Sequence, residues 1–65
     1  MKFNEMDLVK TLVDFPDEGI KKDEIGTVVL VYTKPQEGYE VEFDDSEGRP
    51  KAVFAILPEY LVRYR

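Results

Sequence analysis

The segment of residues 26–32 restricts the fold of this chain more than any other. It reads Gly-Thr-Val-Val-Leu-Val-Tyr, a run of β-branched and aromatic side chains that favours an extended strand. A charged stretch precedes it at residues 15–25, and apolar and acidic residues alternate after it at residues 39–43. Strict alternation is typical of a strand with one buried face and one face in water. The pattern predicts the middle of a small, strongly bent β-structure.

Four prolines divide the rest of the chain into short segments. Proline has no N–H to donate and is kept out of central strands, so each proline is expected at a boundary between elements. We expect strands at residues 8–14, 26–33, 39–43, 51–57 and 61–65, with one 3-10 turn at residues 58–60 before the last strand. The chain is therefore predicted to be all-β, as a single domain covering residues 1–65.

The third expected strand has the clearest division between a buried and a solvated face. Tyr39, Val41 and Phe43 are expected to point inward, and Glu40 and Glu42 to point into water. Alternation in the expected strand 26–33 would place Val28, Leu30 and Tyr32 on one face and the remaining valines on the other.

The connections also have sequence signals. Residues 15–25 are expected to fold over as a hairpin loop whose apolar anchors are Phe15, Ile20 and Ile25. Residues 44–48 are expected to form a tight hairpin in which Gly48 supplies a positive φ. Near the N-terminus, Asn4 is a candidate cap for at most one helical turn within residues 4–10.

Composition narrows the class of protein. A chain of 65 residues buries a modest core, and it has neither cysteine nor histidine. Disulfides and zinc sites built from those residues are therefore excluded. The start of the chain is too polar for a secretory signal, and no apolar run, that of residues 28–32 included, is long enough to span a bilayer. We expect a cytoplasmic protein with no membrane attachment.

Charge is unevenly distributed along the sequence. The net charge is −5, and residues 37–47 contain six acidic residues and no basic one. Residues 48–65 contain four basic residues against one acidic residue. Because phosphate binding draws its affinity from lysine and arginine, this balance disfavours nucleic acid and favours a basic partner.

Five short strands, a long first loop, a tight third hairpin and a 3-10 turn before the last strand match an SH3-like five-stranded small barrel. The chain resembles a family of short bacterial proteins, domain of unknown function 4926, at residues 7–9, 19–29, 31–32, 39–43 and 57–62. The resemblance implies an SH3-type barrel with no established catalytic or ligand-binding residues. It also suggests genes that lie beside toxin genes, and hence an antitoxin-type or immunity-type role.

The residues do not form a constellation for catalysis. The commonest bases and nucleophiles are absent, and Ser46 lies in an expected turn without a base beside it. Asp44 and Asp45 are adjacent and expected to be solvated, as in a polar hairpin tip. The oxygen-rich stretch 44–48 lacks the spacing of an EF-hand loop. We therefore expect no enzyme activity, no cofactor and no specific metal site.

The leading hypothesis is a protein-interaction module. Strands 26–33 and 51–57 are apolar on both faces. Strong bending would account for this pattern if each strand contributed to both halves of a barrel, and a surface that meets another protein would account for it as well. The expected partner is a basic protein or a second copy of the chain. The residues expected to contact it are Val29, Val31, Val53, Glu40, Glu42, Asp44 and Asp45.

A nucleic-acid-binding barrel is the alternative hypothesis. It would use two loop lysines and a basic, aromatic C-terminal strand, in which a tyrosine could stack on a base. The residues concerned are Lys21, Lys22, Arg63, Tyr64 and Arg65. Asp23 and Glu24 offset the two lysines, and the arginines of a last strand often extend to water without a partner.

Overall fold

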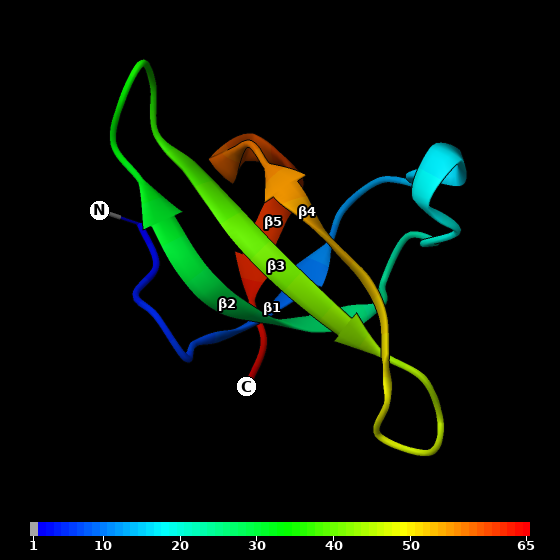
Figure 1. The fold of residues 1–65 in the computed structure, drawn as a ribbon. Coiled ribbons are helices and arrows are strands. Elements are labelled where there is room, and N and C mark those ends of the chain that lie inside the picture. The colour runs from blue at the N-terminus through cyan, green and yellow to red at the C-terminus, as the bar shows by residue number, and fades with distance from the viewer. Residues whose placement is uncertain (1) are drawn as a thin grey trace.

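A computed structural model describes residues 2–65 as one antiparallel sheet of five strands (Figure 1). The strands are β1 (Leu8–Thr11), β2 (Ile25–Tyr32), β3 (Gly38–Asp44), β4 (Pro50–Ile56) and β5 (Leu61–Arg63). Two 3-10 turns interrupt them, η1 (Pro16–Glu18) and η2 (Pro58–Tyr60). The prediction of an all-β chain with a 3-10 turn before the last strand is confirmed.

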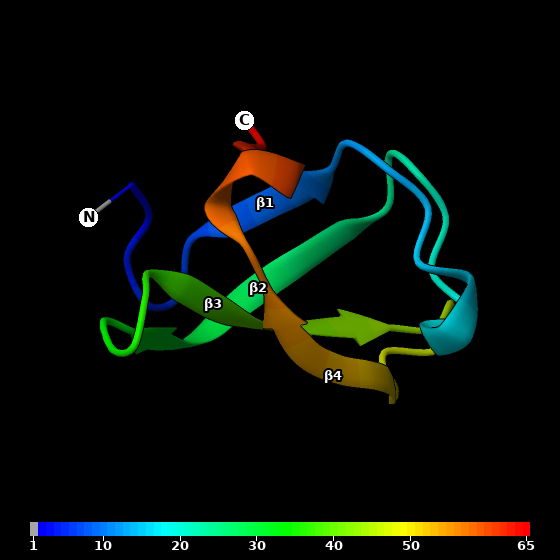
Figure 2. The same cartoon turned by 90° about the horizontal axis from the view of Figure 1, so that it is seen from above.

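The sheet has the strand order β4-β3-β2-β1-β5, so β4 and β5 are its two edges. It is strongly coiled, and Figure 2 shows β1 and β5 on one side of the molecule and β4 on the other. Within residues 2–65 no strand pairing joins β4 to β5, so the sheet is not closed. Closure into a barrel would require hydrogen bonds between these edges, and the expected closed barrel is therefore not confirmed.

Alternate residues of β3 form the centre of the hydrophobic core. Tyr39, Val41 and Phe43 are completely buried, as the alternation predicted. The other buried apolar residues come from every part of the sheet and its loops: Phe3, Val9, Ile20, Val28, Ile56 and Leu61. Complete burial of one such side chain stabilises the fold by roughly 1.5–3 kcal/mol. The inner face of β3 therefore contributes three fully buried side chains to the core.

Gly26 allows β2 to pass close over this core. A Cβ atom added at Gly26 would lie 2.5 Å from Cγ1 of Val41 and 3.0 Å from the backbone oxygen of Glu42. These distances are shorter than van der Waals contact, and the backbone oxygen has no freedom to move aside. The glycine that opens the apolar run is required here for space.

The loop between β1 and β2 folds over as predicted, but it has fewer anchors than expected. Phe15 and Ile20 form a β-bridge, and Ile20 is buried. Ile25 was predicted to be a third anchor, which is wrong, because it is the first residue of β2 and is 38% exposed. The ring of Phe15 packs edge-on against Phe54, with 5.2 Å between ring centres, and so ties the loop to β4.

A buried hydroxyl holds the base of the same loop. The Oγ1 atom of Thr11 donates to the carbonyl oxygen of Lys21 at 2.9 Å and accepts from the N–H of Glu24 at 3.2 Å. Strand β1 ends at this residue, three residues earlier than predicted. One further backbone bond follows, from the N–H of Leu12 to the carbonyl oxygen of Tyr60, and the chain then bends at residues 12 and 13.

Residues 5 and 6 form a turn before β1, and residues 4–10 contain no helix. Asn4 does not act as a cap. Its N–H donates to Oδ2 of Asp7 at 2.8 Å, and its carbonyl oxygen accepts from the N–H of Asp7 at 3.1 Å. Within residues 2–65, no helix has the length and apolar character needed to cross a membrane.

The predicted hairpin between β3 and β4 is confirmed. Gly48 has a φ of 80°, which glycine adopts without strain. The β2–β3 turn contains a cis peptide bond between Lys34 and Pro35.

Candidate protein-binding face

A β-bulge in β2 decides which side chains reach solvent. The register with β3 shifts between Val28 and Leu30, so that Val28 pairs with Val41 but Leu30 pairs with Glu40. The extra residue reverses the alternation in the second half of the strand. Beyond the bulge Val31 packs against the core, whereas Leu30 is 43% exposed.

The faces predicted for β2 are therefore wrong after Val28. Strict alternation placed Val29 and Val31 together on the outside. In the structure Val29 is exposed at the bulge, but Val31 pairs with the buried Tyr39 and lies on the inside. The exposed apolar residues in this half of β2 are instead Val29, Leu30 and Tyr32.

The outward side chains of β2, β3 and β4 form one continuous surface, which we call the outer face. Strand pairing aligns them in two rows, one of Leu30, Glu40 and Ala55 and one of Thr27, Glu42 and Val53. Residues opposite each other in adjacent strands have Cβ atoms within about 5.5 Å, so each row is a set of neighbours. With Tyr32, the outer face thus consists of Thr27, Leu30, Tyr32, Glu40, Glu42, Val53 and Ala55.

Two carboxylates stand in the middle of this surface, on β3. Oε1 of Glu40 accepts a hydrogen bond from the hydroxyl of Tyr32 at 2.8 Å, and this bond raises the pKa of Tyr32. In the part of the chain that the structure describes, neither Glu40 nor Glu42 forms an ion pair with a lysine or arginine. The outer face therefore presents two carboxylates, without cations of their own, between apolar side chains.

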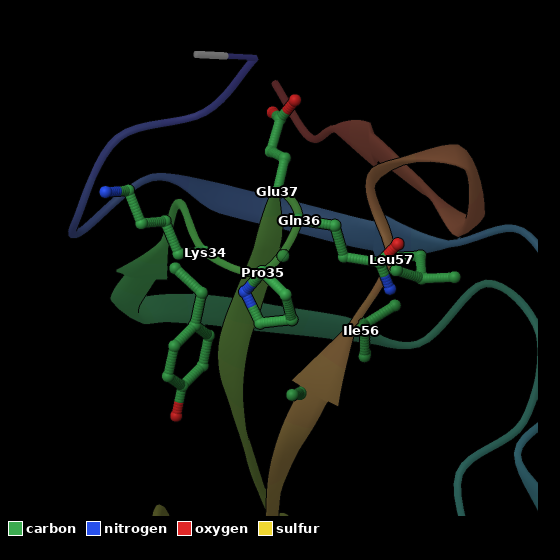
Figure 3. A pocket seen from close by; sticks show the side chains of 9 residues that line it. Lys34, Pro35, Gln36, Glu37, Ile56 and Leu57 are labelled. Carbon is green, nitrogen blue, oxygen red and sulfur yellow. The ribbon is translucent and has the colours of Figure 1, made fainter.

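A cleft of about 380 Å³ continues the outer face beyond Tyr32 and Ala55. The β2–β3 turn forms one side of it, and the end of β4 forms the other (Figure 3). Pro35 and Gln36 face Ile56 and Leu57 across the opening. The lining is mostly apolar, as in sites that accept an apolar side chain or a small ligand.

The carboxylate of Glu37 is not available to this cleft. Figure 3 shows its side chain pointing away from Pro35 and Leu57. It accepts hydrogen bonds from the hydroxyl of Tyr39 and from the N–H of Lys2. The bond from Tyr39 is the main reason that the pKa of Glu37 lies below its ordinary value. Glu37 therefore stabilises the fold and connects the N-terminal segment to β3.

The two predicted aspartates, Asp44 and Asp45, lie at the β3–β4 hairpin. Asp44 is exposed at the end of β3. Oδ1 of Asp45 accepts from the N–H groups of Glu47 at 2.8 Å and Arg49 at 2.9 Å, and these bonds lower the pKa of Asp45. The Asp45 side chain thus shapes the turn. Among residues 2–65, no three His, Cys, Asp or Glu side chains are grouped to hold a metal ion.

The residues of the nucleic-acid hypothesis are not brought together. Lys21 lies beside the Thr11 end of β1, whereas the backbone of Tyr64 bonds to Leu8 at the opposite end. Arg63 forms an ion pair with Asp7 at 2.8 Å, and its guanidinium lies 5.7 Å from the ring centre of Phe3. Lys22, Tyr64 and Arg65 are exposed. Arg63, one of the cations of this set, is therefore already paired with a carboxylate.

Several residues of the site were not found from the sequence. The outward positions of Leu30 and Tyr32 depend on the bulge, for which the sequence of β2 gives no local signal. The cleft depends on the approach of the β2–β3 turn to Leu57. The contribution of β4 was predictable, because its alternation placed Val53 and Ala55 on one face, and both are exposed.

The fold and the outer face define a small all-β domain with one exposed, acidic and apolar sheet face. The chain belongs to the family described as Domain of unknown function (DUF4926), whose model matches residues 5–62. The match extends from the N-terminal turn to Val62 in β5 and so includes the whole outer face. Comparisons with curated proteins and with solved structures gave no match.

Proposed function

We propose that this protein is a non-enzymatic interaction module that binds a basic protein on its outer face. The observation that carries the proposal is the position of Glu40 and Glu42. They stand in the centre of an exposed apolar surface, and within residues 2–65 no lysine or arginine pairs with them. A partner that supplies lysine or arginine there would form two ion pairs with these carboxylates. The apolar neighbours would partly shield the pairs from water, and charge pairs across an interface give specificity for the partner.

The apolar part of the surface supplies the area for binding. Val53 is 45% exposed and Leu30 is 43% exposed, and they lie on opposite sides of β3. Tyr32 adds an aromatic ring whose hydroxyl is already held by Glu40. Apolar side chains grouped on one face of a soluble domain mark protein contact sites, and tyrosine is enriched in them.

The negative charge of the chain is the reason for proposing a basic partner. Residues 37–47 include both carboxylates of the outer face and have no basic residue, and the whole chain has a net charge of −5. Such a field attracts a cationic protein and speeds its association, whereas it repels phosphate. A basic toxin held by an antitoxin-type or immunity-type partner would have the required chemistry.

We also propose that the coiled sheet is a small barrel of the SH3-like class, and that the protein is cytoplasmic. The strand order, the long first loop and the 3-10 turn before β5 support this class. A barrel of this kind offers the face of β2, β3 and β4 as a rigid platform, because side chains on the opposite face fill the core.

A capture experiment with matched variants tests the proposal. Wild-type protein, the double variant E40Q/E42Q and the control D17N/E18Q are immobilised and exposed to a lysate of the native cell. Both variants lose two negative charges, but Asp17 and Glu18 lie in η1, outside the outer face. The expected result is a basic protein that binds the wild type and the control but not E40Q/E42Q.

The captured protein is then purified, and its dissociation constants for the three forms are measured. An equal affinity for E40Q/E42Q and D17N/E18Q would show that only net charge matters, and the outer face would not be the site. Capture of an acidic protein, or of nucleic acid alone, would also contradict the proposal.

A further inference from the structure

Strand β4 is an edge of the sheet whose outer side is open. In the strand order it has β3 on one side and no strand on the other. Apart from its pairing with β3, the described residues give the backbone of β4 no hydrogen-bond partner. In Figure 2, β4 forms the lower border of the molecule, and no other segment is drawn beneath it.

Proteins normally protect such an edge, since unpaired N–H and C=O groups accept a strand from another chain. Here the protection is limited to the first two residues, Pro50 and Lys51. Lys51 is itself held by Glu24, with 2.8 Å between Nζ and Oε1. The next outward residues, Val53 and Ala55, are apolar and exposed, so the remainder of the edge is open to pairing.

The two rows of the outer face show what an added strand would meet. Ala55 lies opposite Glu40, and Val53 lies opposite Glu42. An added strand would extend these rows, and its outward residues would stand beside Ala55 and Val53. Because adjacent strands are about 4.8 Å apart, such a residue would lie about 10 Å from β3. A long lysine or arginine side chain can extend over a residue as small as alanine to a carboxylate at that separation.

We propose that β4 accepts an extended segment of the basic partner as a sixth strand. The segment carries lysine or arginine at two positions separated by one residue, one opposite Ala55 and one opposite Val53. These side chains pair with Glu40 and Glu42, and the backbone of the segment bonds to the free edge. The inference rests on the proposed function and specifies how the partner binds.

A second copy of the chain is a poorer occupant for the same edge. Residues 50–56 contain one basic residue, Lys51, which already pairs with Glu24. Two copies would each bring a net charge of −5 to the contact. A foreign basic strand has the opposite charge and is drawn to the edge by the same field that repels a copy.

The test uses synthetic peptides with the wild-type protein. The probe is Thr-Val-Arg-Val-Arg-Val-Thr with blocked ends, in which the arginines share one face of a strand. Two analogues carry N-methyl groups, one on the arginines and one on the valines. In a strand, alternate N–H groups point to opposite sides, so only one set can bond to β4. Binding is followed by the NMR shifts of backbone amides during titration.

Strand addition predicts shifts that concentrate on β4 and a marked difference between the two methylated peptides. One analogue should bind about as well as the probe, and the other should bind about tenfold or more weakly, as expected for the loss of two or more hydrogen bonds. The variant Glu40→Gln should weaken the probe about two- to fivefold, as for an exposed ion pair, and the control Asp17→Asn should not.

The alternative results separate this inference from the proposed function. If both methylated peptides bind like the probe but still depend on Glu40, the strand pairing is wrong and the basic contact stands. If no peptide shifts β4 although the captured protein binds through Glu40 and Glu42, the strand pairing is again wrong. If β4 amides shift when the protein alone is diluted, the occupant is a second copy, and the inference is overturned.

Discussion

The two faces of β3 have different roles although their residues alternate in one strand. Tyr39, Val41 and Phe43 are completely buried and form the centre of the core. Glu40 and Glu42 lie between them in sequence, on the opposite face, and no cation of residues 2–65 pairs with them. The inner face contributes to the core, and the outer face is the surface on which we propose that a partner binds. The comparison predicts that substitutions on the two faces will have separable effects.

The largest effect is expected from Phe43→Ala on the inner face. Truncation of a buried phenylalanine costs about 3–5 kcal/mol, through lost burial and the cavity that remains. A domain of 65 residues has a total stability of roughly 3–10 kcal/mol, so this variant should lose a large part of it. Urea unfolding followed by circular dichroism measures the effect. A loss below about 1 kcal/mol would mean that the core tolerates a large void there, contrary to close packing.

A smaller loss is expected from Gly26→Ala. The added methyl group would collide with Val41 and with the backbone oxygen of Glu42. Forcing an extra carbon into a packed core typically costs about 1–3 kcal/mol. The same urea experiment measures it, and Gly38→Ala is the control, since a Cβ there lies 3.8 Å from its nearest neighbour. Equal effects at the two glycines would show that space at Gly26 is not limiting.

The bulge in β2 allows a comparison within one strand. Val31→Thr places a hydroxyl against the core and should cost about 1–2 kcal/mol. Val29→Thr changes an exposed residue and should stay within about 0.5 kcal/mol. Differential scanning calorimetry of the two variants gives both values. Equal, small effects at the two positions would place both valines on the outside, as strict alternation does, and would mean that β2 has no bulge.

Acid should weaken the fold through carboxylates that hold it together. The pKa values of Glu24 and Glu37 lie below their ordinary value of 4.5, mainly because of hydrogen bonds from Lys51 and Tyr39 respectively. A lowered pKa in the folded state gives stability that is complete above the ordinary value and is lost as pH falls through the folded value. The urea midpoint should therefore decrease below about pH 4.5.

The control for this pH dependence is Glu37→Gln. The variant removes one of the titrating groups, so its urea midpoint should fall less steeply over the same pH interval. A midpoint that rises steadily from pH 5 to pH 3 in the wild type would contradict the assigned direction of these pKa values.

The fold was largely predictable from local patterns. Alternation in residues 39–43 gave the correct inner and outer faces of β3, and proline and glycine positions marked most turns. These signals depend on residues near in sequence, and the physics that produces them is local. Gly48 is an example, since its positive φ follows from the short hairpin itself.

The remaining features depend on contacts between distant segments. The bulge after Val28 becomes evident only from the pairing of β2 with β3, and it exchanged the predicted faces of Val31 and Leu30. The first strand was predicted too long, because it ends at Thr11, opposite Leu61, the first residue of β5, which is far away in the sequence. The sequence pattern also did not reveal that Oδ1 of Asp45 accepts from the N–H groups of Glu47 and Arg49 within the hairpin. A single sequence does not reveal such pairings before the fold is known.

The affinity of the outer face for its basic partner tests the central claim most directly. The measurement is titration calorimetry of the captured protein with wild type, E40Q/E42Q and D17N/E18Q, beside their urea unfolding curves. We predict that E40Q/E42Q binds at least about tenfold more weakly than D17N/E18Q, while its stability stays within about 0.5 kcal/mol of the wild type. Equal binding by the two variants, or unfolding of E40Q/E42Q, would contradict the separation of recognition from stability on the two faces of β3.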